Sequence, residues 1–160
     1  MLEEHGIQLL RDRDEIRYKD PIRDFMLRLG RGKAVVAVIS ESYLKSKNCM
    51  FEMLEISRAG ALRERIFPIV LPDAQIYEPL RLVEYIGYWE ERTRKLDEGL
   101  KKLRGERLTN LQEQLNRYAD VRQMFDSIAD TLQDMNALTL EQHEGSGFED
   151  LIRRIRAQVG

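Results

Sequence analysis

The chain has 160 residues, 42% of them hydrophobic, and a net charge of −2, which fit one domain with a real core. The lack of a basic excess excludes nucleic-acid binding by bulk charge, and the single cysteine excludes an internal disulfide and fits a reducing cytosol. The acidic start has no signal-peptide core, and no apolar run approaches the ~20 residues of a membrane span. We therefore expect a cytoplasmic protein that binds neither nucleic acid nor membranes.

The first 30 residues contain a short apolar segment, a polar stretch and a helix. Residues 7–10 are mainly apolar and are predicted to form a strand, whereas residues 11–20 are very polar. Asp20 is a good helix cap, and Pro21 suits the first helical position. The helix that follows is expected to end at Gly30 and Gly32. Its apolar face carries Ile22, Phe25, Met26 and Leu29.

The next 40 residues predict two strands joined by a helix. Residues 34–39 form a continuous apolar run rich in β-branched residues, which is typical of a strand buried on both faces. A short polar turn and a helix over 46–62 follow, and residues 65–71 form the next strand. Pro68 removes a ladder donor and indicates an edge strand or a local irregularity. This alternation predicts a parallel sheet with right-handed crossovers.

The second half is predicted to be helical. Residues 90–104 are charged with one apolar face, and residues 108–135 place an apolar residue at every third or fourth position. This second stripe fits packing against the domain as well as dimerisation through a coiled coil. Residues 145–147 indicate a loop before a final helix over 148–157. Trp89 is interpreted as a core residue, with a pocket wall as the alternative.

Several segments occur together in the order of a known family. They are DRDEIRYKDPIRDFMLRLGRGKAVVAVISESYLKSKNCMFEMLEI, RIFPIVLPDAQIY, YIGYWEE, DMNAL and GFEDLIRRI. The chain resembles a bacterial Toll/interleukin-1 receptor (TIR) domain, closely over residues 2–90 and more loosely over 133–157. The resemblance implies a flavodoxin-like α/β fold with a parallel sheet and a helical elaboration. We expect a single domain over 1–160, with its α/β core at 1–89, a helical insertion at 90–135 and a C-terminal loop and helix at 136–160.

The resemblance also indicates a missing element. Family members begin with a strand and a helix, whereas residues 2–6 match only the last turn of that helix. The family strand order, 2-1-3-4-5, would put the missing strand between 7–10 and 34–39, where unpaired backbone groups are costly. We expect a start codon placed too late, with a truncated form or another segment in the gap as alternatives.

The family implies one of two functions. The first is an NAD+ glycohydrolase (an NAD+ nucleosidase) that cleaves the nicotinamide–ribose bond in bacterial stress or antiphage signalling; the alternative is a non-enzymatic adaptor for TIR–TIR association. The resemblance implies that Glu52, in the pattern C-x-x-E-[LM] at 49–53, stands at the family's catalytic position. A single carboxylate suits this chemistry, because it can stabilise the oxocarbenium-like transition state. The alternative is a glutamate that caps or pairs on a helix surface.

Residues 11–20 correspond to the family's BB loop, which gates the pocket and contacts other domains. Asp14, Ile16, Tyr18 and Ile22 match its pattern best and are the predicted interaction residues. The loop also supplies predicted substrate contacts: Arg11 for a phosphate, Tyr18 for stacking on a ring, and Asp14 beside them. A solvated loop is the alternative.

Ser40, Ser46 and Cys49 complete the predicted substrate-binding set. Ser46 is most simply a helix N-cap, although a phosphate can bind at such a helix N-terminus. Cys49 is expected to be half-buried rather than a nucleophile, and one cysteine with two distant histidines gives no metal site. NAD+ is expected as a substrate, with no cofactor. Other TIR domains are the expected partners, in a homo-oligomer that forms on activation.

Overall fold

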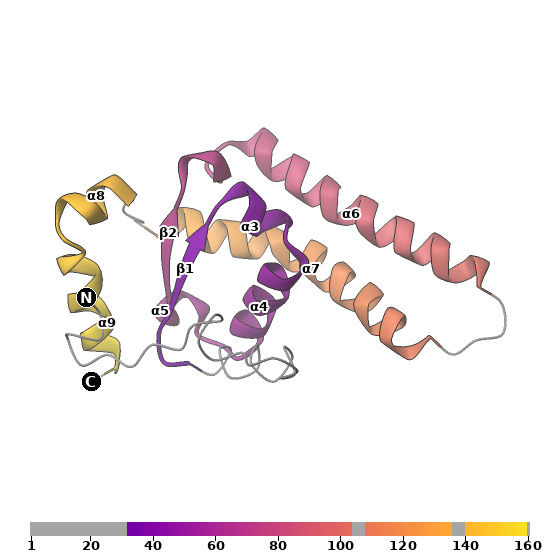
Figure 1. Cartoon of the computed structure of the whole chain (residues 1–160), viewed down its shortest axis with the longest axis horizontal. Coiled ribbons are helices and arrows are strands. Elements are labelled where there is room, and N and C mark those ends of the chain that lie inside the picture. The colour runs from indigo at the N-terminus through magenta and orange to yellow at the C-terminus, as the bar shows by residue number, and fades with distance from the viewer. Residues whose placement is uncertain (1–31, 104–107, 136–139, 160) are drawn as a thin grey trace, which may run out of the picture.

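The computed structural model describes residues 32–103, 108–135 and 140–159. The predicted strand at 7–10 and the helix after Pro21 therefore lie outside the described residues, and the absence of the family's first strand stays a prediction. In chain order the described elements are β1 (Val35–Ile39), α3 (Glu41–Lys45), α4 (Lys47–Arg58), α5 (Leu62–Arg65), β2 (Ile66–Val70), the 3-10 helix η2 (Pro72–Ala74), α6 (Pro79–Lys102), α7 (Thr109–Asp134), α8 (Leu140–Gly145) and α9 (Glu149–Val159) (Figure 1).

The two strands pair in parallel, as predicted. Their register runs from Val35 opposite Ile66 to Ile39 opposite Val70. Within the described ranges β2 pairs with β1 alone, which agrees with Pro68 as the mark of an edge strand. The chain crosses from β1 to β2 through three short helices, so both strands end at the same edge of the sheet.

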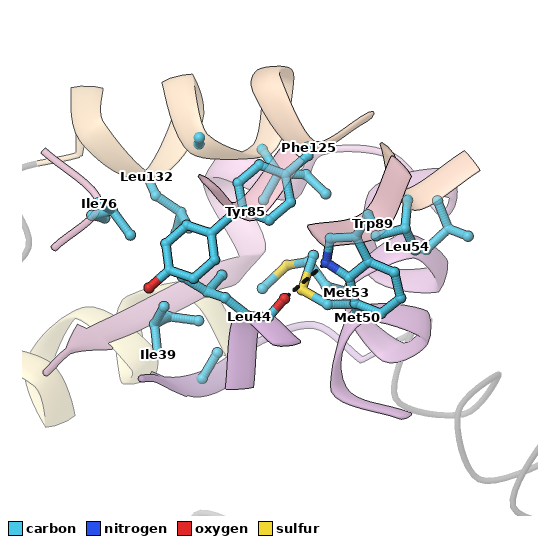
Figure 2. Packing of buried hydrophobic residues seen from close by; sticks show 14 of the residues in the cluster. Ile39, Leu44, Met50, Met53, Leu54, Ile76, Tyr85, Trp89, Phe125 and Leu132 are labelled. Carbon is cyan, nitrogen blue, oxygen red and sulfur yellow. Dashed lines mark hydrogen bonds between the residues drawn. The ribbon is translucent and has the colours of Figure 1, made fainter. Parts of the chain in front are cut away.

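One face of the sheet carries the main core (Figure 2). Ala37, Ile39 and Ile66 pack there against α4, α6 and α7. The apolar stripe of α7 faces this core, so packing against the domain is confirmed for the part of the stripe that is buried. Its buried members are Tyr118, Val121, Phe125, Ile128, Ala129 and Leu132.

On the opposite face of the sheet, the described residues cover β2 but leave β1 exposed. Alternation along the strands turns Phe67 and Ile69 of β2 toward α9, where Ile69 is buried with residues of that helix. Their register partners on β1, Val36 and Val38, remain 36% and 49% exposed. Burial of β1 on both faces was therefore a wrong prediction for the described structure, because α9 lies over β2 and leaves the β1 half of this face uncovered.

A long hairpin formed by α6 and α7 extends past the sheet (Figure 1). The charged helix predicted from residue 90 begins at Pro79 and runs without a break to Lys102. Pro79 takes the first helical turn, where its missing N–H costs no hydrogen bond. Trp89 is fully buried in the main core, which confirms its interpretation as a core residue.

Four helices differ from the sequence-based prediction: α3, α5 and α8 were not predicted, and α4 is shorter than expected. The segment expected as a turn after β1 is helix α3, and the loop expected at 145–147 is preceded by α8. The helix predicted over 46–62 ends at Arg58, because Gly60 and Ala61 adopt positive φ angles of 84° and 52° that an α-helix cannot continue through.

Candidate functional site

The carboxyl ends of β1 and β2 meet at one edge of the sheet, where open α/β sheets bind their ligands. Ser40 and α3 follow β1, and Leu71 and η2 follow β2. The Leu71 N–H donates to the Ile39 carbonyl at 2.8 Å and continues the pairing just beyond the strands. The candidate site is therefore the group of side chains on α3, the start of α4 and η2.

Ser40 begins α3. Its hydroxyl oxygen accepts the Tyr43 N–H at 3.0 Å and lies 2.9 Å from the Ser42 hydroxyl. This capping bond explains why residues 41–45 form a helix rather than the predicted turn, because it satisfies one of the N–H groups that a helix start leaves without a partner.

Ser46 ends α3 and begins α4, which confirms its prediction as an N-cap. Its N–H donates to the Tyr43 carbonyl at 3.1 Å, and its hydroxyl accepts the Cys49 N–H at 3.4 Å. Since the hydroxyls of Ser40 and Ser46 both serve as caps, any contact with a substrate phosphate would add to these bonds. Their substrate-binding roles remain predictions.

The structure brings Tyr43, Cys49 and Glu52 together where α3 meets α4. Glu52 lies on the second turn of α4 and is half-buried, as is Cys49. Burial raises the pKa of the Tyr43 phenol well above its usual value, and the negative charges of Glu52 and Cys49 raise that pKa further. A tyrosine is neutral at physiological pH even at its ordinary pKa of about 10, and the raised pKa keeps Tyr43 neutral at more alkaline pH as well.

Glu41 joins the segments that surround this edge. Its N–H donates to the Asp73 carboxylate at 3.3 Å, and its own carboxylate lies 2.6 Å from Lys45 Nζ and 3.2 Å from an Arg81 nitrogen. The hydrogen bond and charge of Lys45 lower the pKa of Glu41, with a smaller contribution from Arg81. Glu41 thus ties α3 to η2 and α6.

A comparison of the sequence with models of protein families identifies the family of this chain. The family model described as "TIR domain" matches residues 1–104. The chain belongs to the TIR domain family. Neither the curated proteins nor the solved structures contain a match.

The match to the TIR family covers every element of the candidate site. It includes β1 to η2 and all of α6, whereas α7 to α9 lie beyond it. The α/β, flavodoxin-like fold with a helical elaboration follows from this membership together with the parallel strands. TIR domains generally associate with other TIR domains and act in signal transduction.

The predicted BB loop of this TIR domain lies outside the described residues. That holds for the predicted substrate contacts Arg11, Asp14 and Tyr18 and for the interaction residues Ile16 and Ile22. Among the described residues, Ser40 and Ser46 cap the starts of α3 and α4, and Cys49 and Glu52 follow Ser46 on α4 beside Tyr43. The sequence analysis did not name Tyr43, nor did it name Glu41, Asp73 and Arg81. Recognition of Ser40 as an N-cap would have predicted α3 and drawn attention to Tyr43.

Other features of the described structure lie away from this edge. A cavity of about 910 Å³ is lined by α5, the start of β2 and α9, at the amino end of β2. In the ranges that the structure covers, no three His, Cys, Asp or Glu side chains gather as a metal site would require. None of the described helices has the length and apolarity of a membrane span.

Proposed function

We propose that this TIR domain is an NAD+ nucleosidase with Glu52 as its catalytic carboxylate. The observation that carries the proposal concerns Glu52: it is half-buried on the second turn of α4, and its negative charge acts on the neutral Tyr43 of α3. Partial burial strengthens the electrostatic effect of a carboxylate on a nearby cation. Cys49, the only cysteine of the chain, lies three residues earlier on the same helix.

The reaction requires little acid–base chemistry. The C1–nitrogen bond of NAD+ breaks, its electron pair leaves with nicotinamide, and the ribose becomes an oxocarbenium ion. Glu52 stabilises that cation and orients the ribose hydroxyls. Water attacks C1 and loses a proton to solvent, which gives ADP-ribose; attack by another group of the same molecule gives a cyclic product instead. The ring nitrogen of nicotinamide becomes neutral on departure, so no general acid is needed.

Association with other copies belongs to the same proposal. The expected partners are other TIR domains, and the expected active form is a homo-oligomer, with Asp14, Ile16, Tyr18 and Ile22 at the contact. The biological setting we propose is bacterial stress or antiphage signalling. Turnover should therefore rise more steeply than protein concentration, because association would precede catalysis.

The test measures NAD+ consumption by the purified chain at high concentration. Glu52→Gln keeps the size and polarity of the side chain but removes its charge, and should lower turnover by roughly a hundredfold or more. Glu64→Gln makes the same change on α5, at the amino end of the sheet, and should leave turnover unchanged.

The outcomes of this test distinguish the enzyme from the non-enzymatic adaptor. Turnover that survives Glu52→Gln would show that the mechanism is wrong. If neither wild type nor variant consumes NAD+ at any concentration, the adaptor function takes precedence. The adaptor predicts self-association that is lost when Ile16 and Tyr18 are changed and is retained in Glu52→Gln, as measured by analytical ultracentrifugation.

A further inference from the structure

Two aromatic side chains of α6 donate hydrogen bonds to the end of α3. Trp89 Nε1–H donates to the Leu44 carbonyl at 2.9 Å, and the Tyr88 hydroxyl lies 3.1 Å from the Lys45 carbonyl. Figure 2 shows the indole nitrogen of Trp89 directed at that Leu44 oxygen. Helix α6 is thus bonded to the backbone of the segment that carries Tyr43.

These bonds satisfy backbone carbonyl groups at the end of α3. The helix has only five residues, and the last four carbonyls of any helix have no partner within it. The N–H of Ser46 takes the Tyr43 carbonyl, while Trp89 and Tyr88 take the next two. The residue that follows these carbonyls is Ser46, which caps α4, so the same contacts fix where α4 begins.

Arg92 determines how the Tyr88 hydroxyl is used. Its guanidinium donates to Tyr88 Oη at 3.1 Å and to Tyr118 Oη on α7 at 3.4 Å. It lies 5.4 Å and 5.5 Å from the centroids of those two rings. Arginine has no acceptor, so the single hydroxyl hydrogen of Tyr88 is directed to the Lys45 carbonyl. A continuous series of contacts thus links α7, α6 and the end of α3.

We propose that Tyr88 is a positioning residue for the corner between α3 and α4. By holding the Lys45 carbonyl it fixes Ser46, and through the Ser46 cap it fixes the first turns of α4 with Cys49 and Glu52. Tyr88 does not contact substrate. Its effect on the corner rests on the described contacts alone, whereas its effect on turnover rests on the proposed NAD+ hydrolysis.

The first test uses Tyr88→Phe, which removes the hydroxyl and keeps the ring. Amide hydrogen exchange at Ser46 and Cys49 should become roughly three- to tenfold faster, which corresponds to the loss of one hydrogen bond. The thiol of Cys49, the only one in the chain, should react faster with a thiol reagent by a similar factor.

Tyr85→Phe provides the matched control on the same helix. Its hydroxyl donates to the Ala74 carbonyl of η2 at 2.8 Å, so its loss should accelerate exchange around 72–75 and leave Ser46 and Cys49 unchanged. Unchanged exchange at Ser46 and Cys49 in Tyr88→Phe, or the same acceleration there in both variants, would overturn the proposal. These measurements decide the question even if the protein consumes no NAD+.

The second test applies when wild type consumes NAD+ and Glu52→Gln does not. Tyr88→Phe should then lower kcat by about fivefold or more while KM changes less than twofold, with a thermal midpoint within about 2 °C of wild type. If the role of Tyr88 were purely structural, Tyr88→Phe would lower the thermal midpoint and the fraction of active protein. It would not lower kcat in folded protein while leaving KM nearly unchanged. An unchanged kcat in a fully folded Tyr88→Phe would refute the effect on turnover and leave the proposed activity standing.

Discussion

The two faces of the β1–β2 sheet differ in how they are covered. One face meets α4, α6 and α7 in a continuous core that includes the fully buried Tyr85 and Trp89. The other meets α9 through a small cluster of Ile69, Leu151 and Ile155. Because the candidate site lies on α3 and α4 and is bonded to α6, it depends on the first face. This comparison indicates that loss of α9 should cost far less than loss of α7.

Truncation of a side chain on the α7 side should have the largest effect. Phe125 is 2% exposed and its ring lies 5.6 Å from that of Tyr85. Phe125→Ala should reduce the free energy of unfolding by about 3–5 kcal/mol, because it removes a buried ring and leaves a cavity. Chemical denaturation with tryptophan fluorescence measures it, since Trp89 is the only tryptophan and lies in the same core.

Phe125→Leu keeps most of the apolar volume and serves as the control, with a loss of less than half that of Phe125→Ala. A loss below about 1 kcal/mol for Phe125→Ala would mean that α7 is not part of the cooperative core. The asymmetry between the two faces would then be incorrect.

The same truncation on the α9 side should have a smaller and more local effect. Ile155 is 3% exposed, in the small cluster with Ile69. Ile155→Ala should cost about 2–3 kcal/mol, near the lower end for such substitutions, because few neighbours surround the side chain. Hydrogen exchange should accelerate in α9 and remain at its wild-type rate in α7.

Exposed Arg154 lies beside it on α9, and Arg154→Ala is the control that should leave α9 exchange within a factor of two of wild type. If Ile155→Ala accelerates exchange equally in α7 and α9, the two faces unfold together, and α9 is as central to the fold as the hairpin.

The sequence predicted the elements whose patterns are long or strongly apolar. Both strands, the cap at Ser46 and the stripe of α7 follow from periodicity and capping chemistry. The missed helices α3, α5 and α8 have six residues or fewer, too few for a periodic pattern to appear. The end of α4 was predictable from Gly60, and the start of α6 from Pro79.

The candidate site was predictable only in part. The position of Glu52 came from a motif and that of Ser46 from a cap. Tyr43, Arg81 and Tyr88 depend on which helix packs beside which, and local pattern does not contain that information. The half-exposed Val38 is a related case: a β-branched run identifies a strand, whereas burial of its second face depends on what the rest of the chain places there.

The weakest expected effect concerns pH and again distinguishes the two faces. His143 on α8 is 4% exposed, stacks on Phe148 with ring centroids 5.6 Å apart, and its Nδ1 has no hydrogen-bond partner among the described residues. Burial lowers the pKa of His143 below its usual value. Below a pH of about 6.5 the unfolded chain therefore binds a proton that the folded α8 resists.

Stability from this residue should be complete above pH 6.5 and should diminish as the pH falls toward the lowered pKa of folded His143. The thermal midpoint of wild type should decrease as the pH is lowered from 8 to 5, and that of His143→Gln should change less. The exchange of α8 and α9 amides should accelerate over the same interval, while Ser46 and Cys49 keep their rates. Equal pH dependence in wild type and variant would mean that His143 titrates normally and that solvent reaches it on the α9 side.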